Sequence, residues 1–282
     1  MTAAAIRTET HGRIRTIVFA RAAEYNTITP QWRDEFSAAL DEAERDHGIH
    51  VVVLRADGQA FCAGYGLDWS TAAQASAEER SRAWDSVADL HMIGRYVRVF
   101  RKMWDLSKPV IAAVHGWCIA GGTDMVLCAD MIIAGDSAKF GYPPSRVWGV
   151  PTSAMWVYRM GFERAKRYLL TGDEIGAREA EKIGLILECV PDSELEARAM
   201  ALAERMALVP LNQLSMLKML CNEPAEHMGL RSSQLLGSFF DGVARHSQEG
   251  RDFVTRAQEV GFRQAVRERD APFGDYGERK NK

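Results

Sequence analysis

The sequence predicts a mixed α/β protein whose second half is helical. Over the first half of the chain, short runs of β-branched and aliphatic residues, typical of buried strands, alternate with segments of helix length. Strands that alternate with helices favour a mainly parallel sheet. From about Arg164 onward the strand pattern fades. We therefore expect an α/β core over residues 1–195 and a helical region over residues 196–282.

The elements of the expected core follow one another along the chain. Thr29 is suited to cap a helix and Pro30 to begin it, and apolar residues then recur at helical spacing as far as about His47. An Ala/Ser/Glu-rich stretch at residues 70–82 predicts a mobile loop before a helix that ends near Trp104. Strands are expected at residues 15–20, 51–55, 110–114 and 131–134.

The second half reads as successive helices. Gly172, Gly184, Pro191 and Pro210 are the turn-forming residues that separate them. The expected helical segments are residues 164–171, 177–182, 193–207, 211–221 and 230–269.

Composition and charge exclude several classes of function. The net charge of −3 gives no basic surface for nucleic acid. The longest uncharged run, between Lys108 and Asp124, is shorter than the ~20 apolar residues of a membrane span. The five cysteines form no C-x-x-C pair, so neither a disulfide framework nor a zinc site is expected. With no cationic and apolar leader at the N-terminus, we expect a cytoplasmic protein.

Two glycine-bearing turns, each after an expected strand, are the candidate site. The first is G-Q-A-F-C-A-G-Y-G-L at residues 58–67, and the second is the strand and turn K-P-V-I-A-A-V-H-G-W-C-I-A-G-G-T-D at residues 108–124. The second leads a strand into a Gly-Gly pair that opens a helix, where main-chain N–H groups have no helical partner and favour negative charge. Either turn alone is more often a tight strand–helix junction. Both together predict an oxyanion hole, in which two N–H groups converge on one carbonyl oxygen.

These segments resemble the crotonase (enoyl-CoA hydratase/isomerase) superfamily, whose motifs read roughly G-x-x-F-x-A-G-x-D-L and K-P-V-I-A-A-V-x-G-x-x-x-G-G-G-x-E. The similarity extends from about Arg21 to Pro191 and includes Asn26, the L-L-T-G at residues 169–172 and a tail similar to R-x-x-P-x-F. The resemblance implies a repeated ββα spiral core and a C-terminal helical region that mediates trimerisation, as a trimer or a dimer of trimers. It implies an acyl-CoA thioester substrate, no metal, and no cofactor apart from the coenzyme A of the substrate.

The resemblance also implies roles for individual residues. The N–H groups of Tyr65 and Gly121 occupy the oxyanion-hole positions, and Asp124 occupies the position of a catalytic glutamate. A basic residue that the family often has before the early Asn motif is here Glu24. Residues expected to contact the substrate or its CoA moiety are Tyr25, Ala60, Cys62, Ala63, Gly64, Gly66, Leu67, Trp117, Ile119, Gly122 and Pro143.

The side chains that would decide the reaction depart from the family pattern. Family hydratases use two glutamates around a water, and here the first is the shorter Asp124 and the second is Pro144. Hydration or isomerisation is the expected activity. Thioester hydrolysis, β-carboxyl decarboxylation and acyl-CoA binding without catalysis remain alternatives, because each needs the turns but not the glutamate pair.

Other polar and aromatic residues have more ordinary interpretations. Asp124 itself suits the first turn of a helix, where the dipole favours a carboxylate. A structural or solvent-facing role is expected for Asp68, Tyr142 and Arg146, a turn hydrogen bond for His115, a surface or core position for His91, burial for Cys62, and a place in the acyl pocket or core for Trp117 and Trp148.

Overall fold

Two sheets form the centre of the protein. The computed structural model describes residues 3–66 and 83–276. In the larger sheet the strand order is β1-β2-β3-β5-β7-β10, with only the β1–β2 pair antiparallel. Its strands are β1 Ile6–His11, β2 Ile14–Phe19, β3 Val51–Ala56, β5 Val110–Val114, β7 Met131–Gly135 and β10 Glu188–Val190.

The smaller sheet is connected to the larger one by the same kind of short turn three times. Its order is β4-β6-β8-β9, and its strands are β4 Ala60–Cys62, β6 Trp117–Ile119, β8 Lys139–Gly141 and β9 Ile175–Gly176. Each of β3, β5 and β7 ends in a short turn that leads into β4, β6 or β8. The parallel β4, β6 and β8 therefore end on the same side, where the two glycine-bearing turns follow β4 and β6.

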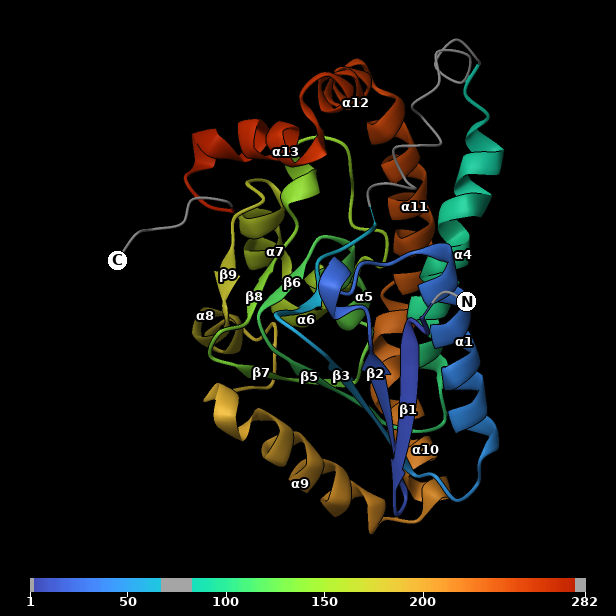
Figure 1. The fold of residues 1–282 in the computed structure, drawn as a ribbon. Helices are drawn as coiled ribbons and strands as arrows, with labels where there is room; N and C mark the ends of the chain where they lie inside the picture. The colour runs from blue at the N-terminus through green and yellow to red at the C-terminus, as the bar shows by residue number, and fades with distance from the viewer. Residues whose placement is uncertain (1–2, 67–82, 277–282) are drawn as a thin grey trace.

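Helices surround the sheets (Figure 1). The first helix begins as expected, since Pro30 follows Thr29, whose hydroxyl accepts a hydrogen bond from the Trp32 N–H at 3.1 Å. The helices are α1 Pro30–Arg45, α4 Ser86–Asp105, α5 Gly121–Val126, α6 Met155–Met160, α7 Phe162–Leu169, α8 Ala177–Lys182, α9 Leu195–Ala207, α10 Leu211–His227, α11 Leu230–His246, α12 Gln248–Val260 and α13 Phe262–Asp270. Short 3₁₀ turns cover Ala22–Glu24, Pro143–Arg146, Asp192–Glu194 and Ala271–Phe273.

Two apolar clusters hold these layers together. One side of the large sheet packs with the small sheet and with α1 and α4, around Phe19, Trp32 and Phe36. The other side packs against α9, whose Leu195, Ala199 and Ala203 face the strands. Figure 1 shows α9 lying along the lower side of the sheet.

The expected α/β class is confirmed, with a few differences in the elements. The expected strands at residues 15–20, 51–55, 110–114 and 131–134 correspond to β2, β3, β5 and β7. The long helical stretch at residues 230–269 is broken by Ser247 and Gly261 into α11, α12 and α13. The expected loop at residues 70–82 lies outside the described residues. No helix within residues 3–66 and 83–276 has the length and apolarity to cross a membrane.

A buried ion pair attaches the helical region to the sheet. Lys218 of α10 lies 2.8 Å from Asp130, which follows α5, and donates to the carbonyls of Met103 and Lys108 at 2.7 and 3.0 Å. Asp130 also accepts the Val110 N–H at the start of β5, at 2.7 Å. Burial lowers the pKa of Lys218 and raises that of Asp130, because both charges have left water. The pair is therefore sensitive to the loss of either partner.

Replacing Lys218 with methionine is expected to lower the free energy of unfolding by about 3–5 kcal/mol, because Asp130 would remain buried without its cation. Chemical denaturation measures this difference. Lys182→Met is the matched control, since this lysine is 79% exposed and a surface change is worth about 0.5 kcal/mol or less. Equal midpoints for the two variants would contradict the prediction.

Candidate active site

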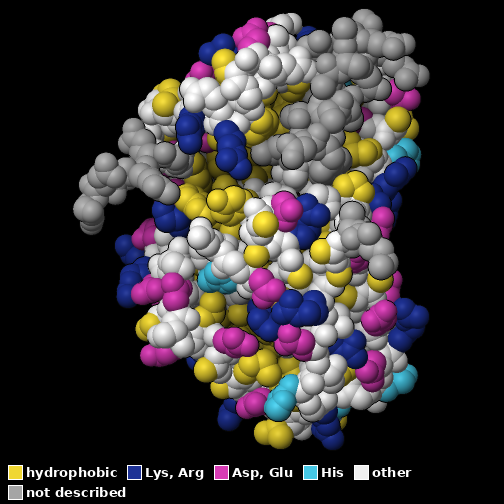
Figure 2. Space-filling model, in the orientation of Figure 1, with side chains coloured by type: hydrophobic (Ala, Val, Ile, Leu, Met, Phe, Trp, Pro, Cys, Tyr) yellow, Lys and Arg dark blue, Asp and Glu magenta, His cyan; other side chains and the backbone are white. Residues whose placement is uncertain are grey.

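A cavity of about 630 Å³ lies where the two glycine-bearing turns face the C-terminal helices. Figure 2 shows a hollow with a hydrophobic floor below α12 and α13. The turns contribute Ala63, Tyr65, Ile119, Ala120 and Gly121. The opposite walls come from one face of α4 (Asp89, Met92, Ile93, Tyr96), from the end of α11 (Asp241, Arg245, His246) and from α13 (Phe262, Arg263, Val266, Arg267, Arg269).

The two turns approach each other so closely that no β-carbon fits between them. A Cβ on Gly122 would lie 2.2 Å from the Cys62 carbonyl oxygen, and one on Gly121 would lie 2.7 Å from the Tyr65 ring. A Cβ on Gly64 would lie 2.9 Å from that of Ala120 and 3.3 Å from the Gly121 nitrogen. Only glycine permits this approach. Segments more than fifty residues apart in the sequence therefore meet at this point, while an oxyanion hole formed by their N–H groups stays a prediction.

Neighbouring N–H groups in these turns are used to hold the turns in place. The N–H groups of Ala63, Gly66 and Ala120 donate to the carbonyls of Tyr25, Ile28 and Gly141 at 2.8–3.1 Å. Gly121 is the first residue of α5, so its N–H has no intrahelical acceptor. Within the described part of the chain no carbonyl accepts a hydrogen bond from it. This N–H lies at the cavity wall, where the helix N-terminus favours a developing negative charge.

Asp124 lies one turn behind Gly121 and is almost completely buried, at 1% exposure. Its carboxylate accepts four hydrogen bonds, from the N–H and hydroxyl groups of Thr152 and Ser153, at 2.5–2.9 Å. Burial raises its pKa, and the bonds from Ser153 and Thr152 oppose that rise. It is not among the residues that line the cavity. Proton transfer by Asp124 stays a prediction, while its contacts hold the segment before α6 against α5.

The position of the second family carboxylate holds no group that transfers a proton. Pro143 and Pro144 begin the 3₁₀ turn after β8, and both line the cavity. Tyr142 also lines it, but its hydroxyl donates to the Val150 carbonyl at 2.9 Å. Arg146 forms ion pairs with Asp270 and Asp275 at 3.0 and 2.7 Å, so its guanidinium joins this turn to the C-terminal segment. The structural role expected for Arg146 fits these contacts.

A charged group that sequence reasoning missed lies on the far wall of the cavity. Arg245 of α11 donates to both oxygens of Asp89 from α4, at 2.8 and 2.9 Å, and to Asp241 at 2.9 Å. Asp241 also accepts the Val150 N–H at 3.2 Å. Only the i, i+4 spacing of Asp241 and Arg245 was visible in the sequence. That spacing is common on exposed helix faces and does not distinguish a buried pair.

The predicted contact residues divide into those at the cavity and those behind it. Ala63, Trp117, Ile119 and Pro143 line the cavity with Tyr65 and Gly121. Burial raises the pKa of the Cys62 thiol to about 12, which excludes a thiolate nucleophile at neutral pH. Leu67 and Asp68 lie outside the described residues. The residues buried behind the turns are Ala60, Cys62, Gly64, Gly66 and Gly122.

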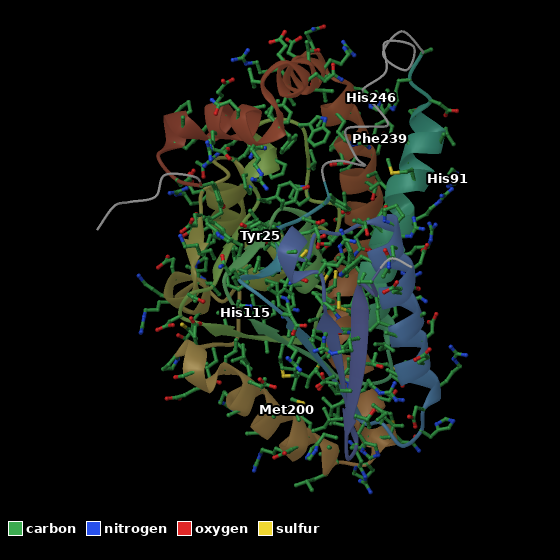
Figure 3. The ribbon with its side chains drawn as sticks, in the orientation of Figure 1. Tyr25, His91, His115, Met200, Phe239 and His246 are labelled. Carbon is green, nitrogen blue, oxygen red and sulfur yellow. The ribbon has the colours of Figure 1, made fainter. Side chains whose placement is uncertain are left out.

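Figure 3 labels the remaining candidate residues and shows where they lie. Tyr25 is 45% exposed on the turn before α1, and its backbone is left-handed with φ 53°. His115 lies 2.9 Å from the Gly58 carbonyl through Nε2, so the expected turn hydrogen bond is present. His91 is exposed on α4. His246, which was not predicted, lines the cavity and stacks on Trp84 with ring centroids 4.8 Å apart.

Comparisons with known proteins agree with this fold. A sequence model of the enoyl-CoA hydratase/isomerase family matches residues 9–259. A crystal structure of enoyl-CoA hydratase from Mycobacterium smegmatis is 40% identical with a TM-score of 0.90, over 97% of this chain and 95% of that one. An enoyl-CoA hydratase/isomerase from Xanthobacter autotrophicus Py2 is 27% identical with a TM-score of 0.87, over 96% of this chain and 99% of that one.

A curated relative with a different activity is also similar. The mitochondrial Delta(3,5)-Delta(2,4)-dienoyl-CoA isomerase of Dictyostelium discoideum is 29% identical over 198 residues, which is 67% of each chain. Both activities in these names concern unsaturated CoA thioesters. With the family match over most of the chain and the same fold in solved structures, this protein belongs to the enoyl-CoA hydratase/isomerase family of the crotonase superfamily and is an acyl-CoA-processing enzyme.

Proposed function

We propose that the main-chain N–H groups of Tyr65 and Gly121 bind the thioester oxygen of an acyl-CoA and stabilise the enolate formed from it. The close approach of Gly64 to Ala120 and Gly121 is the observation that carries this proposal, because it brings the two turns to one point of the cavity wall. Donors fixed before the reaction stabilise developing charge without reorganisation, and one such donor is worth about 3–4 kcal/mol of the barrier.

Replacing Gly122 with alanine is expected to slow turnover at least ~100-fold, because the new Cβ would meet the Cys62 carbonyl and force the turns apart. The measurement is deuterium exchange from D₂O into the Cα position of butyryl-CoA, followed by mass spectrometry. This saturated thioester reports enolate formation whatever the net reaction is.

Gly176→Ala is the matched control, since a Cβ there meets no atom within 4 Å and its backbone is extended with φ −70°. It is expected to exchange at the unmodified rate. Butyryl-CoA that stays unlabelled in the unmodified enzyme, while it binds, would refute enolate stabilisation. Unchanged exchange in folded Gly122→Ala would refute the role of these turns.

The net reaction is proposed to be one that needs stabilisation of an anion on the thioester oxygen but not two glutamates. Pro144 removes one of the groups that would position water, and Asp124 is held by four hydrogen bonds. Double-bond migration fits best within the family, and decarboxylation or thioester hydrolysis remains the second candidate. Offering crotonyl-CoA to the same enzyme separates hydration from these reactions, and slow hydration beside fast Cα exchange is the expected result.

The CoA moiety is proposed to lie along α13. Arg263 and Arg267 are one turn apart on this helix, both line the cavity, and both are exposed. Their positive charges suit the phosphates of CoA, which enters as part of the substrate and not as a resident cofactor.

The double variant Arg263→Ala/Arg267→Ala is expected to weaken acyl-CoA binding at least ~10-fold at low salt, because two phosphate contacts are lost. Titration calorimetry with butyryl-CoA and with butyryl-pantetheine, which lacks these phosphates, isolates the effect. The pantetheine thioester should bind both proteins equally, and Lys182→Ala should bind CoA like the unmodified protein. An equal loss for both ligands would contradict a phosphate site.

Self-association is proposed to cover the outer face of α10 and α11. Large apolar side chains are exposed there, more than a monomer surface usually carries together. They are Met216, Met219, Leu220, Leu235, Leu236, Phe239 and Phe240. We assign this face to further copies of the same chain, as a trimer or a dimer of trimers.

Leu220→Glu is expected to shift the protein toward monomer in analytical ultracentrifugation, because a charge would be buried in the interface. Leu170→Glu is the control, since Leu170 is 82% exposed and directly follows α7, a helix that Figure 1 shows apart from α10 and α11. An unmodified protein that sediments as a monomer would contradict the assignment.

A cytoplasmic location is proposed as well, in keeping with five cysteines that form no disulfide.

A further inference from the structure

A saturated thioester such as butyryl-CoA forms an enolate only if some group takes the Cα proton, and the family positions leave that group unassigned. Position 144 is proline, and the Asp124 carboxylate is enclosed by Thr152 and Ser153 behind the cavity wall. Among the described residues that line the cavity, the carboxylates belong to Asp89 and Asp241. Asp89 and Asp241 are therefore the candidate bases among these residues.

Asp241 lies at the same end of the cavity as the missing family glutamate. A Cβ added to Gly149 would lie 2.8 Å from the Pro144 Cβ, 3.4 Å from the Tyr142 hydroxyl and 3.5 Å from Asp241 Oδ1. These three groups are therefore close together. Gly149, Pro144 and Tyr142 all line the cavity. Asp241 Oδ1 is thus near the proline position, within the residues that line the cavity.

The two cavity carboxylates differ in how many of their oxygens accept hydrogen bonds from the Arg245 guanidinium, two in Asp89 and one in Asp241. Both oxygens of Asp89 accept hydrogen bonds from Arg245, and the Trp84 Nε1 adds a third contact at 3.4 Å. Asp241 accepts a hydrogen bond from Arg245 through Oδ2. Among the described residues, its Oδ1 accepts only the Val150 N–H, at 3.2 Å. A carboxylate oxygen has two lone-pair positions, so Oδ1 retains capacity to accept a proton.

We propose that Asp241, which the helical region carries into the cavity on α11, is the catalytic residue that removes and returns the Cα proton of the bound thioester. This inference rests on the proposed enolate chemistry. The Asp241 carboxylate takes the proton from Cα, and the electron pair of that C–H bond forms the double bond to the carbonyl carbon. The carbonyl π electrons move onto oxygen, where the two N–H groups stabilise them. The neutral carboxylic acid then returns a proton to carbon.

The surroundings of Asp241 suit a base in an apolar site. Burial raises its pKa, and Arg245 opposes that rise. A carboxylate of raised pKa is a stronger base, while the guanidinium and the Val150 N–H fix its direction. Gln234 of the same helix donates to the Ser153 carbonyl at 3.0 Å, which keeps α11 against the segment that Asp124 holds.

The test compares Cα deuterium exchange of butyryl-CoA in single variants of the full-length enzyme. Asp241→Asn is expected to lose at least ~100-fold in exchange rate, the usual contribution of a general base, while the dissociation constant of butyryl-CoA changes less than tenfold. Asp89→Asn alters the same guanidinium cluster and is expected to lose less than tenfold. Asp124→Asn tests the remaining carboxylate near the turns.

A size-matched pair keeps the test decisive if Asp241→Asn folds poorly. Asp241→Glu and Asp241→Gln have side chains of equal length, and only the first can accept a proton. The glutamate variant is expected to exchange at least tenfold faster than the glutamine variant at equal butyryl-CoA occupancy. Equal rates for this pair would overturn the inference, as would equal losses in Asp89→Asn and Asp241→Asn, or a loss confined to Asp124→Asn.

Failure of the inference and failure of the proposed function remain distinguishable. If the unmodified enzyme exchanges and the Asp241 variants do so too, only the assignment of the base falls. If the unmodified enzyme binds butyryl-CoA without exchange, the enolate chemistry and the base fall together.

Discussion

The absence of β-carbons on three glycines where the two turns meet is the steric constraint on which the site depends. Gly64, Gly121 and Gly122 let the segment after β4 lie against the start of α5, where any larger residue would meet a carbonyl, a ring or another Cβ. Ala120 takes a strained backbone conformation, φ 53° and ψ −126°, to turn the chain from β6 into α5. Both turns start from parallel neighbouring strands, so the sheet sets their spacing and the glycines permit the contact.

From this contact, hydrogen bonds extend outward to the helical region. Asp124 holds Thr152 and Ser153, the Ser153 carbonyl accepts from Gln234, and Val150 donates to Asp241. A Cβ on Gly237 would lie 2.6 Å from the Pro151 carbonyl, which shows how closely α11 follows the same segment. The C-terminal helices therefore do more than cover the core, because α11 brings a charged cluster to the cavity wall.

Sequence reasoning succeeded where a local pattern has one common structural meaning. The run at residues 110–114 could only be a buried strand, and Thr29-Pro30 only a helix start. It missed β4, β6 and β8, whose three-residue length is too short for a period of two to be recognised. It also merged α11, α12 and α13, although Ser247 caps α12 with its side chain and Gly261 takes φ 84°, which are local helix-end signals that the prediction overlooked.

By itself the sequence determined the family, the α/β core and the two turns, because glycine spacing and buried strands are local properties of the chain. Tertiary structure decided which side chains reach the cavity. Asp89 and Asp241 are 152 positions apart, and only the packing of α4 on α11 adds Asp89 to the Asp241–Arg245 pair within α11. Thr152 and Ser153, from a segment distant in the sequence, enclose Asp124, whose position in the motif indicated chemistry. Burial and hydrogen-bond partners determine the pKa of a carboxylate and its capacity to transfer a proton, and neither can be inferred from the spacing of residues.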